Sequence, residues 1–265
     1  MPLEVLLGIY AAVLGLIVGS YLNVVVYRLP RGISTVLPRS RCPECGAAIR
    51  AGDNVPVVSY LLLGGRCRAC RARISWRYPL VEAATAALFL ASFLRFGVSF
   101  EAPAAALLCG LLLALALIDF DHMILPDALT WPAIALGILL QPFLPWARLW
   151  DGPWGALAGA AFGAALGAGI LLAVWGAWYL VRREEGMGLG DAKMLAAVGA
   201  FLGWKGVLVT LFIAALSGSM VGLALMAWGG LGAKSRLPFG TFLAFGGLIA
   251  LFAGEPLVQA YARLL

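Results

Sequence analysis

Long apolar segments recur along almost the whole chain, and they constrain the fold more than any other feature of the sequence. A helix that crosses a membrane needs about 20 apolar residues, with about 17 as the lower bound. The chain is 63% hydrophobic and only 12% charged, whereas a soluble domain is roughly half apolar and about a quarter charged. We therefore expect an all-α polytopic membrane protein with about eight transmembrane helices. The eight apolar segments are Val5–Val26, Leu80–Phe96, Ala104–Ile118, Leu129–Pro145, Trp154–Val181, Ala192–Trp204, Val207–Trp228 and Phe239–Ala253.

Two of these segments carry further information. Ala192–Trp204 is the shortest, so it either crosses a thinned bilayer at a tilt or is re-entrant and shielded by neighbouring helices. The fifth segment contains small residues four positions apart, a pattern that favours close packing between helices. These residues are Gly155, Gly159, Gly163 and Gly167.

The basic residues indicate the orientation in the membrane. The stretch from Arg28 to Tyr78 contains ten arginines, against the two acids Glu44 and Asp53. If the eight segments cross the membrane in alternating directions, fifteen Lys and Arg residues lie on one side of the membrane and four on the other. Because cytoplasmic loops carry the excess of Lys and Arg, we expect the Arg-rich loop to be cytoplasmic and both termini to lie outside.

Two acidic residues reach the cytoplasmic face in this topology. Asp119 ends the third segment, and Asp191 begins the sixth, within the glycine-rich run Gly186–Asp191. An acid at the mouth of a membrane segment is costly and is a candidate functional residue. For Asp191 alone, a helix N-cap is an equally good interpretation, and Asp127 also has the pattern of an N-cap for the fourth segment.

The pairing of Asp119 with Asp191 predicts hydrolytic chemistry. Two adjacent carboxylates share one proton, so one can act as the base toward a water molecule and the other as the acid toward a peptide carbonyl oxygen. No Ser-His-Asp set is available, because the only histidine, His122, lies within the acidic run itself. A zinc peptidase is poorly supported, since the plausible zinc ligands are four cysteines, which leave no open coordination position.

Two Cys-x-x-Cys pairs lie in the Arg-rich loop. Their spacing predicts a tetrahedral zinc site, and a structural site is the simplest interpretation because four-Cys sites are usually closed. The alternatives are nucleic-acid binding and redox chemistry, but the orientation rule already explains the arginines, so we expect no nucleic-acid partner. The four residues are Cys42, Cys45, Cys67 and Cys70. Glu82, just inside the second segment, either pairs with an arginine or serves a binding pocket.

Taken together, these motifs resemble the bacterial type IV prepilin peptidases, which are bifunctional leader peptidases and N-methyltransferases. The resemblance covers nearly the whole chain and rests on motifs that include the paired cysteines. The other motifs are Ser20–Pro30, Asp119 with Ile124–Asp127, Gly188–Lys193, and Pro238–Gly240. The motif that begins at Pro238 departs from the family pattern, because Thr241 stands where a second Pro is expected.

The resemblance implies cleavage of a prepilin or pseudopilin leader, typically after Gly and before Phe, and methylation of the new amino terminus with S-adenosylmethionine. Asp119 and Asp191 match the catalytic aspartates, and the four cysteines match the metal ligands. We further hypothesise that Glu82 helps to bind the methyl donor and that Gly188, Gly190 and Lys193 line the substrate path.

We expect two domains: residues 1–79, with the first helix and the zinc loop, and residues 80–265, the transmembrane aspartic peptidase. The protein should be a multi-pass protein of the bacterial inner membrane, in contact with lipid and with its active site toward the cytoplasm. The alternative is a proton-coupled transporter that uses the same acids, but it predicts acids at the bilayer midplane and an internal repeat.

Overall fold

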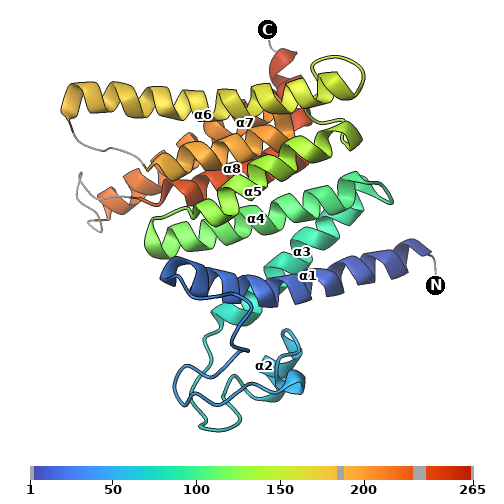
Figure 1. Ribbon diagram of the computed structural model, residues 1–265, viewed down its shortest axis with the longest axis vertical. Helices are drawn as coiled ribbons and strands as arrows, with labels where there is room; N and C mark the ends of the chain where they lie inside the picture. Colours follow the sequence, from blue (N-terminus) through green and yellow to red (C-terminus); the bar gives the residue numbers. More distant parts are fainter. Residues whose placement is uncertain (1–2, 184–187, 229–236, 264–265) are drawn as a thin grey trace. The chain divides into compact units, whose positions relative to one another are not determined.

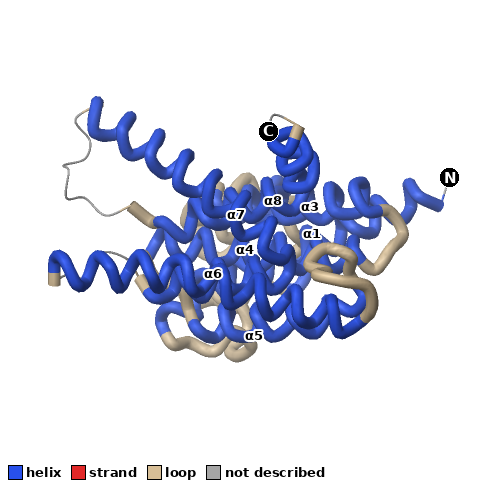
Figure 2. The backbone as a smooth tube through the Cα atoms, turned by 90° about the horizontal axis from the view of Figure 1, so that it is seen from above, coloured by secondary structure: helices blue, strands red, loops and turns tan. Residues whose placement is uncertain are grey.

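The computed structural model of the chain describes residues 3–183, 188–228 and 237–263. Throughout these ranges the regular elements are helices, with two isolated β-bridges and no strand (Figure 2). Six of the described helices are long and apolar enough to cross a membrane. The prediction of an all-α integral membrane protein is therefore confirmed, whereas the count of eight spans is not.

The chain forms two compact units, Met1–Gly110 and Leu111–Leu265, with the boundary inside α4 (Glu101–His122). In the first unit α1 (Leu3–Arg28) lies beside α3 (Arg77–Phe96) (Figure 1). Glycine allows this contact, since a methyl group at Gly19 would lie 2.7 Å from the Glu82 Cα. The loop between α1 and α3 contains three short helices: η1 (Leu29–Arg31), η2 (Ala51–Asp53) and α2 (Val58–Leu62).

In the second unit, the beginning of α7 forms the core. Almost every residue of α7 from Asp191 to Gly203 is buried, so neighbouring helices surround this part of Ala192–Trp204, and whether the segment crosses the membrane fully stays a prediction. The glycine row of α6 is buried as well, as its spacing predicted. The helices of this unit, besides the end of α4, are α5 (Asp127–Leu140), η3 (Gln141–Phe143), α6 (Pro153–Arg182), α7 (Leu189–Ala227) and α8 (Phe239–Ala262).

The helix α7 folds back on itself at Gly203. This residue has φ 67° and ψ −171°, a conformation outside the helical region that is essentially restricted to glycine. A methyl group at Gly199 would lie 2.8 Å from the Val207 Cγ2, although residues eight positions apart are separated by about 12 Å along a straight helix. Residues 189–202 and 204–227 are therefore two arms of a hairpin, which correspond to the sixth and seventh predicted segments.

A buried glutamine supports this break. The Gln141 side chain is fully buried, and its Nε2 donates hydrogen bonds to the carbonyl oxygens of Ala200, at 3.1 Å, and Phe201. An interrupted helix leaves carbonyls without their usual N–H partners, and such groups are costly when buried. Gln141 therefore compensates for the break and helps to fix the arm that begins with Asp191.

Candidate active site and metal centre

Asp119 lies in the last turn of α4 and is only 4% exposed. Its Oδ2 accepts a hydrogen bond from the backbone N–H of Thr241 at 2.8 Å, and the Thr241 Oγ1 lies 3.4 Å from the same oxygen. These contacts join residues 122 positions apart in the chain. They place the carboxylate against the first turn of α8.

The helix α8 has no cap of its own, which explains this contact. Its N-cap is Pro238, with no side-chain capping bond. The first N–H groups of a helix have no partner within it and carry the positive end of the helix dipole. Asp119 accepts one of these N–H groups and so caps α8 from a neighbouring helix. The same contact offsets the unfavourable position of an acid at the carboxyl end of α4.

Asp191 is the third residue of α7 and is 7% exposed. The N-cap of this helix is Gly188, so the interpretation of Asp191 as an N-cap is wrong. The backbone of Gly188 lies beside this carboxylate, since a methyl group at Gly188 would lie 3.8 Å from the Asp191 Oδ2. The carboxylate also lies near enough to Asp119 for the two charges to interact. Two buried acids from different helices, 72 positions apart in the sequence, thus lie near each other.

Leu125, in the loop between α4 and α5, packs against the first turns of both α7 and α8. A methyl group at Gly190 would lie 2.8 Å from the Leu125 Cβ, and one at Gly240 would lie 3.0 Å from its Cδ1. A methyl group at Gly240 would also lie 2.9 Å from the Asp119 Oδ2. The site therefore needs glycine where the first turns of α7 and α8 approach Leu125 and the carboxylate.

Lys193 holds the start of α7 to the start of α5. Its Nζ lies 2.5 Å from the Asp127 Oδ1 and 5.7 Å from the centre of the Trp131 ring. The predicted N-cap role of Asp127 is wrong, because Pro126 occupies the N-cap position and Asp127 pairs with Lys193 instead. The expected role of Lys193 in the substrate path stays a prediction.

The four predicted metal ligands come together in the first unit. All four Sγ atoms lie within 4.8 Å of one another, and those of Cys42 and Cys70 are 3.8 Å apart. Tetrahedral zinc with Zn–S bonds of about 2.3 Å requires sulfur atoms about 3.8 Å apart. The donor set therefore fits zinc, as the spacing of the cysteines predicted, although the identity of the metal stays a prediction.

Two similar turns present these sulfur atoms. In the first, the Gly46 N–H donates to the Cys42 carbonyl at 2.9 Å, and in the second the Arg71 N–H donates to the Cys67 carbonyl at 3.0 Å. Gly46 and Arg71 both adopt positive φ, 70° and 62°. Backbone hydrogen bonds from Cys70 and Ala69 lower the pKa of the Cys67 thiol to about 7, which favours the thiolate that a metal binds.

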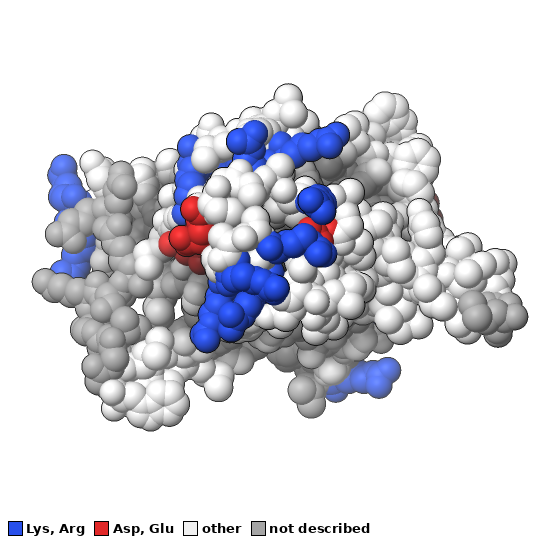
Figure 3. Space-filling view, turned by 90° about the horizontal axis from the view of Figure 1, so that it is seen from below, with Lys and Arg blue, Asp and Glu red and all other residues white. Residues whose placement is uncertain are grey.

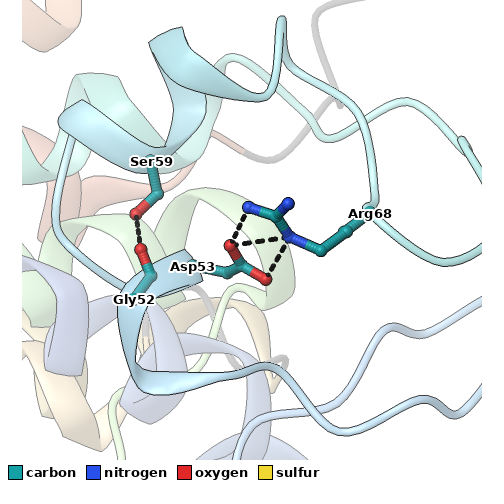
Figure 4. Close-up of polar contacts among 4 residues, drawn as sticks. All are labelled: Gly52, Asp53, Ser59 and Arg68. Carbon is teal, nitrogen blue, oxygen red and sulfur yellow. Dashed lines mark hydrogen bonds and ion pairs between the residues drawn. The ribbon is translucent and has the colours of Figure 1, made fainter.

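Contacts near the cysteines close the loop on itself. Arg68 forms a bidentate pair with Asp53, with Nη2–Oδ1 and Nε–Oδ2 distances of 2.7 and 2.9 Å, and this hydrogen bonding lowers the pKa of Asp53 (Figure 4). The Ser59 Oγ donates to the Gly52 carbonyl at 3.2 Å. Lys and Arg side chains gather on the face shown in Figure 3. Lys234 and Arg236 are two of the fifteen basic residues from which the orientation in the membrane was predicted, and they lie outside the residues that the structure describes.

Glu82 is 7% exposed and has a defined partner in the same unit. Its Oε2 accepts the backbone N–H of Val57 at 2.7 Å. Val57 has φ 60° and ψ −49°, and the Val58 N–H donates across it to the Pro56 carbonyl at 2.6 Å. This is a classic γ-turn, which is rare and strained, and more so for a β-branched residue. The structure thus shows Glu82 holding the loop, and its predicted role toward a methyl donor stays a prediction.

Residues 13–96 match the family described as "Bacterial Peptidase A24 N-terminal domain", and residues 106–223 match the "Type IV leader peptidase family". The chain is 40% identical over 280 residues to the prepilin leader peptidase/N-methyltransferase of Pseudomonas putida, with 96% of this chain and 93% of the relative covered.

Further relatives carry the same name. The chain is 40% identical over 276 residues to the protein of Pseudomonas aeruginosa, covering 94% of this chain and 91% of the relative. It is 42% identical over 272 residues to that of Burkholderia pseudomallei, covering 93% and 85%. No solved structure matches the chain. These similarities extend over both compact units, and the chain therefore belongs to the type IV leader peptidase family.

Proposed function

We propose that this chain cleaves the leader from prepilins or pseudopilins and then methylates the new amino terminus. The observation that carries the peptidase assignment is that two buried acids, Asp119 at the end of α4 and Asp191 at the start of α7, lie near enough to interact although 72 positions separate them. The names of the relatives support both activities. A proton-coupled transporter is not favoured, because the relatives that share this sequence over nearly its whole length carry peptidase names.

The two carboxyl groups share one proton, so one acts as a base while the other acts as an acid. One carboxylate removes a proton from water as the water oxygen attacks the carbonyl carbon of the scissile bond. The protonated partner gives its proton to the carbonyl oxygen, which produces a tetrahedral diol. As the diol collapses, the C–N bond breaks, the leaving amine takes a proton, and the leader departs with a free carboxyl group.

A glycine beside the acids suits a substrate that needs room to come close to them. Gly188 leaves such room beside Asp191, since a methyl group there would meet, among the described residues, only the Asp191 Oδ2 at 3.8 Å and the Gly190 nitrogen at 3.9 Å, whereas Gly190 and Gly240 pack against Leu125. The substrate continues into an apolar helix, which would reach this site through the membrane. Lys193, held by Asp127, would border the same path.

The loop with four cysteines has a structural role in this proposal. Cys42, Cys45, Cys67 and Cys70 would hold a zinc ion that fixes a loop too small to build an apolar core. Zinc here supplies structure and no open coordination position for a reaction. We assign residues 1–79 to this loop and to methyl transfer, and residues 80–265 to proteolysis.

Methyl transfer requires an electrophilic methyl donor, and S-adenosylmethionine supplies that chemistry. When bound, the donor would supply an activated methyl group to the new amine, which would release a proton in exchange. Glu82, which holds the loop at Val57, would act in this half of the enzyme. The expected orientation places both reactions at the cytoplasmic face of the inner membrane, where the basic loop meets anionic lipid.

A cleavage assay tests the peptidase assignment. Purified protein in detergent would be mixed with a synthetic prepilin peptide that spans the leader junction and the start of the apolar helix. We expect Asp119→Ala and Asp191→Ala to abolish cleavage, and Cys67→Ser to retain at least a part of it. Asp121→Asn is the matched control, since this acid is exposed, two positions from Asp119.

The outcome that contradicts the assignment is cleavage at the wild-type rate by either of the two aspartate variants. Methyl transfer is followed separately, with a labelled methyl donor and an already cleaved peptide. We expect transfer to fall in Glu82→Ala while cleavage continues, and undiminished transfer would remove Glu82 from that half of the enzyme.

A further inference from the structure

Thr241 makes three polar contacts at the end of α4. Its backbone N–H donates to the Asp119 Oδ2 at 2.8 Å, and its Oγ1 lies 3.1 Å from the Ala116 carbonyl oxygen and 3.4 Å from the same Oδ2. One residue of α8 therefore holds both the acid and the turn of α4 that carries it.

The backbone N–H is the dominant contact to the carboxylate. A hydroxyl has a single proton, and the Ala116 carbonyl is the nearer acceptor for it. The N–H of Thr241 has no acceptor within α8, because Thr241 is the third residue of that helix and the first N–H groups of a helix lack partners within it. Hydrogen bonds to a charged group are also stronger than those between neutral groups.

Both contacts go to Oδ2 and leave Oδ1 to other partners. A carboxylate held by one oxygen keeps its other oxygen in a defined direction, and catalytic groups need such positioning to within a fraction of an ångström. The carboxylate also lies close to the first turn of α8, since a methyl group added at Gly240 would lie 2.9 Å from the same Oδ2.

We propose that Thr241 is a positioning residue, which anchors Oδ2 of Asp119 so that Oδ1 faces the reacting water. This inference rests on the proposed role of Asp119 in leader cleavage. A proline at position 241 would offer neither an N–H nor a hydroxyl to the acid.

Three substitutions separate the contacts. Thr241→Pro removes the N–H and the hydroxyl, Thr241→Val removes only the hydroxyl, and Thr241→Ser keeps both. Thr130→Val is the matched control, because this buried threonine of α5 also donates its hydroxyl to a backbone carbonyl, that of Pro126 at 3.4 Å. Each variant would be measured for kcat and KM on the prepilin peptide, together with its thermal unfolding midpoint in detergent.

We expect kcat of Thr241→Pro to fall about 10- to 100-fold, the range for the loss of a hydrogen bond to a charged group, with KM changed by less than about twofold. Thr241→Val should lose about two- to fivefold in kcat, because its N–H remains. Thr241→Ser should restore kcat to within about twofold of the wild type, and Thr130→Val should have no effect of that size.

Three results would overturn the proposal: an unchanged kcat in Thr241→Pro, a rise in KM without a fall in kcat, or a serine variant as slow as the proline variant. If the proline variant fails to fold, the comparison of Thr241→Val with Thr241→Ser decides, and equal kcat values overturn the proposal. Asp119→Asn is measured alongside. Cleavage that survives in Asp119→Asn contradicts the proposed function itself, whereas an inactive Asp119→Asn with fully active Thr241 variants contradicts only the role of Thr241.

Discussion

Replacement of Gly203 by alanine should open the hairpin of α7 and destabilise the unit that carries both acids. Gly203 has φ 67° and ψ −171°, a conformation that costs a residue with a side chain about 1–3 kcal/mol. The new methyl group would lie 2.9 Å from the Ala147 Cα and 3.0 Å from its Cβ, and such overpacking costs about 1–3 kcal/mol more. We therefore expect Gly203→Ala to lose roughly 2–6 kcal/mol of stability.

The matched control is Gly176→Ala in α6, where no atom lies within 4 Å of an added methyl group. This change should be neutral or stabilise the protein by up to about 1 kcal/mol, the helix preference of alanine over glycine. Unfolding would be followed by titration with SDS in detergent micelles, with circular dichroism as the signal. Cleavage should fall in Gly203→Ala, because Asp191 begins the arm that ends at this break.

Equal stability of Gly203→Ala and the wild type, within about 0.5 kcal/mol, would refute the hairpin. A straight helix through residue 203 would then be the better description, and the buried position of the first arm would need another explanation. Loss of stability in Gly176→Ala of the same size would show that the assay does not separate the break from an ordinary helical glycine.

Three further changes test separate parts of the structure. Gly240→Ala should reduce cleavage at least about tenfold without unfolding the protein, because its methyl group would lie 2.9 Å from the Asp119 Oδ2 and displace the carboxylate; peptide cleavage measures this, and an active variant contradicts the tight fit. Cys67→Ser, or a strong chelator, should release about one equivalent of zinc and make the loop sensitive to added protease, while the enzyme still cleaves the prepilin peptide. Elemental analysis and limited proteolysis measure this, and a wild-type protein without metal contradicts the assignment. Val57→Gly should raise the thermal unfolding midpoint, because glycine tolerates φ 60°. Glu82→Gln should lower the midpoint, because it weakens the hydrogen bond that the side chain accepts from the Val57 N–H. Equal midpoints for the two variants would contradict a strained turn held by Glu82.

The parts of the fold that could be predicted from the sequence rest on local patterns. Apolar length predicted the helices, and the cysteine spacing predicted the cluster, because knuckle geometry depends on only a few residues. Alternation of the segments predicted that Asp119 and Asp191 reach the same depth; the structure places the two acids near enough to interact, whereas the membrane face stays a prediction. The break of α7 fell close to its predicted place, between the sixth and seventh segments.

The contacts that complete the site could not be predicted in the same way. Thr241 and Asp119 are 122 positions apart, and nothing local to either residue indicates a hydrogen bond between them. Thr241 was distinguished only by standing where proline is expected. Asp127 was misread as an N-cap, because its capping pattern is local whereas its actual partner, Lys193, comes from another helix. Leu125 stands within the Ile124–Asp127 motif, but a leucine in a loop gives no indication of what it packs against.

The account depends on Asp119 and Asp191 acting as one catalytic unit, and a double-mutant cycle of asparagine variants tests this most directly. The rate constant for prepilin peptide cleavage would be measured for Asp119→Asn, Asp191→Asn and the double variant. Residues that act as a unit are strongly non-additive, so we expect each single variant to lose at least about a thousandfold and the double variant to be no slower than either. Losses that multiply in the double variant, or a single variant that keeps most of its activity, would contradict the dyad.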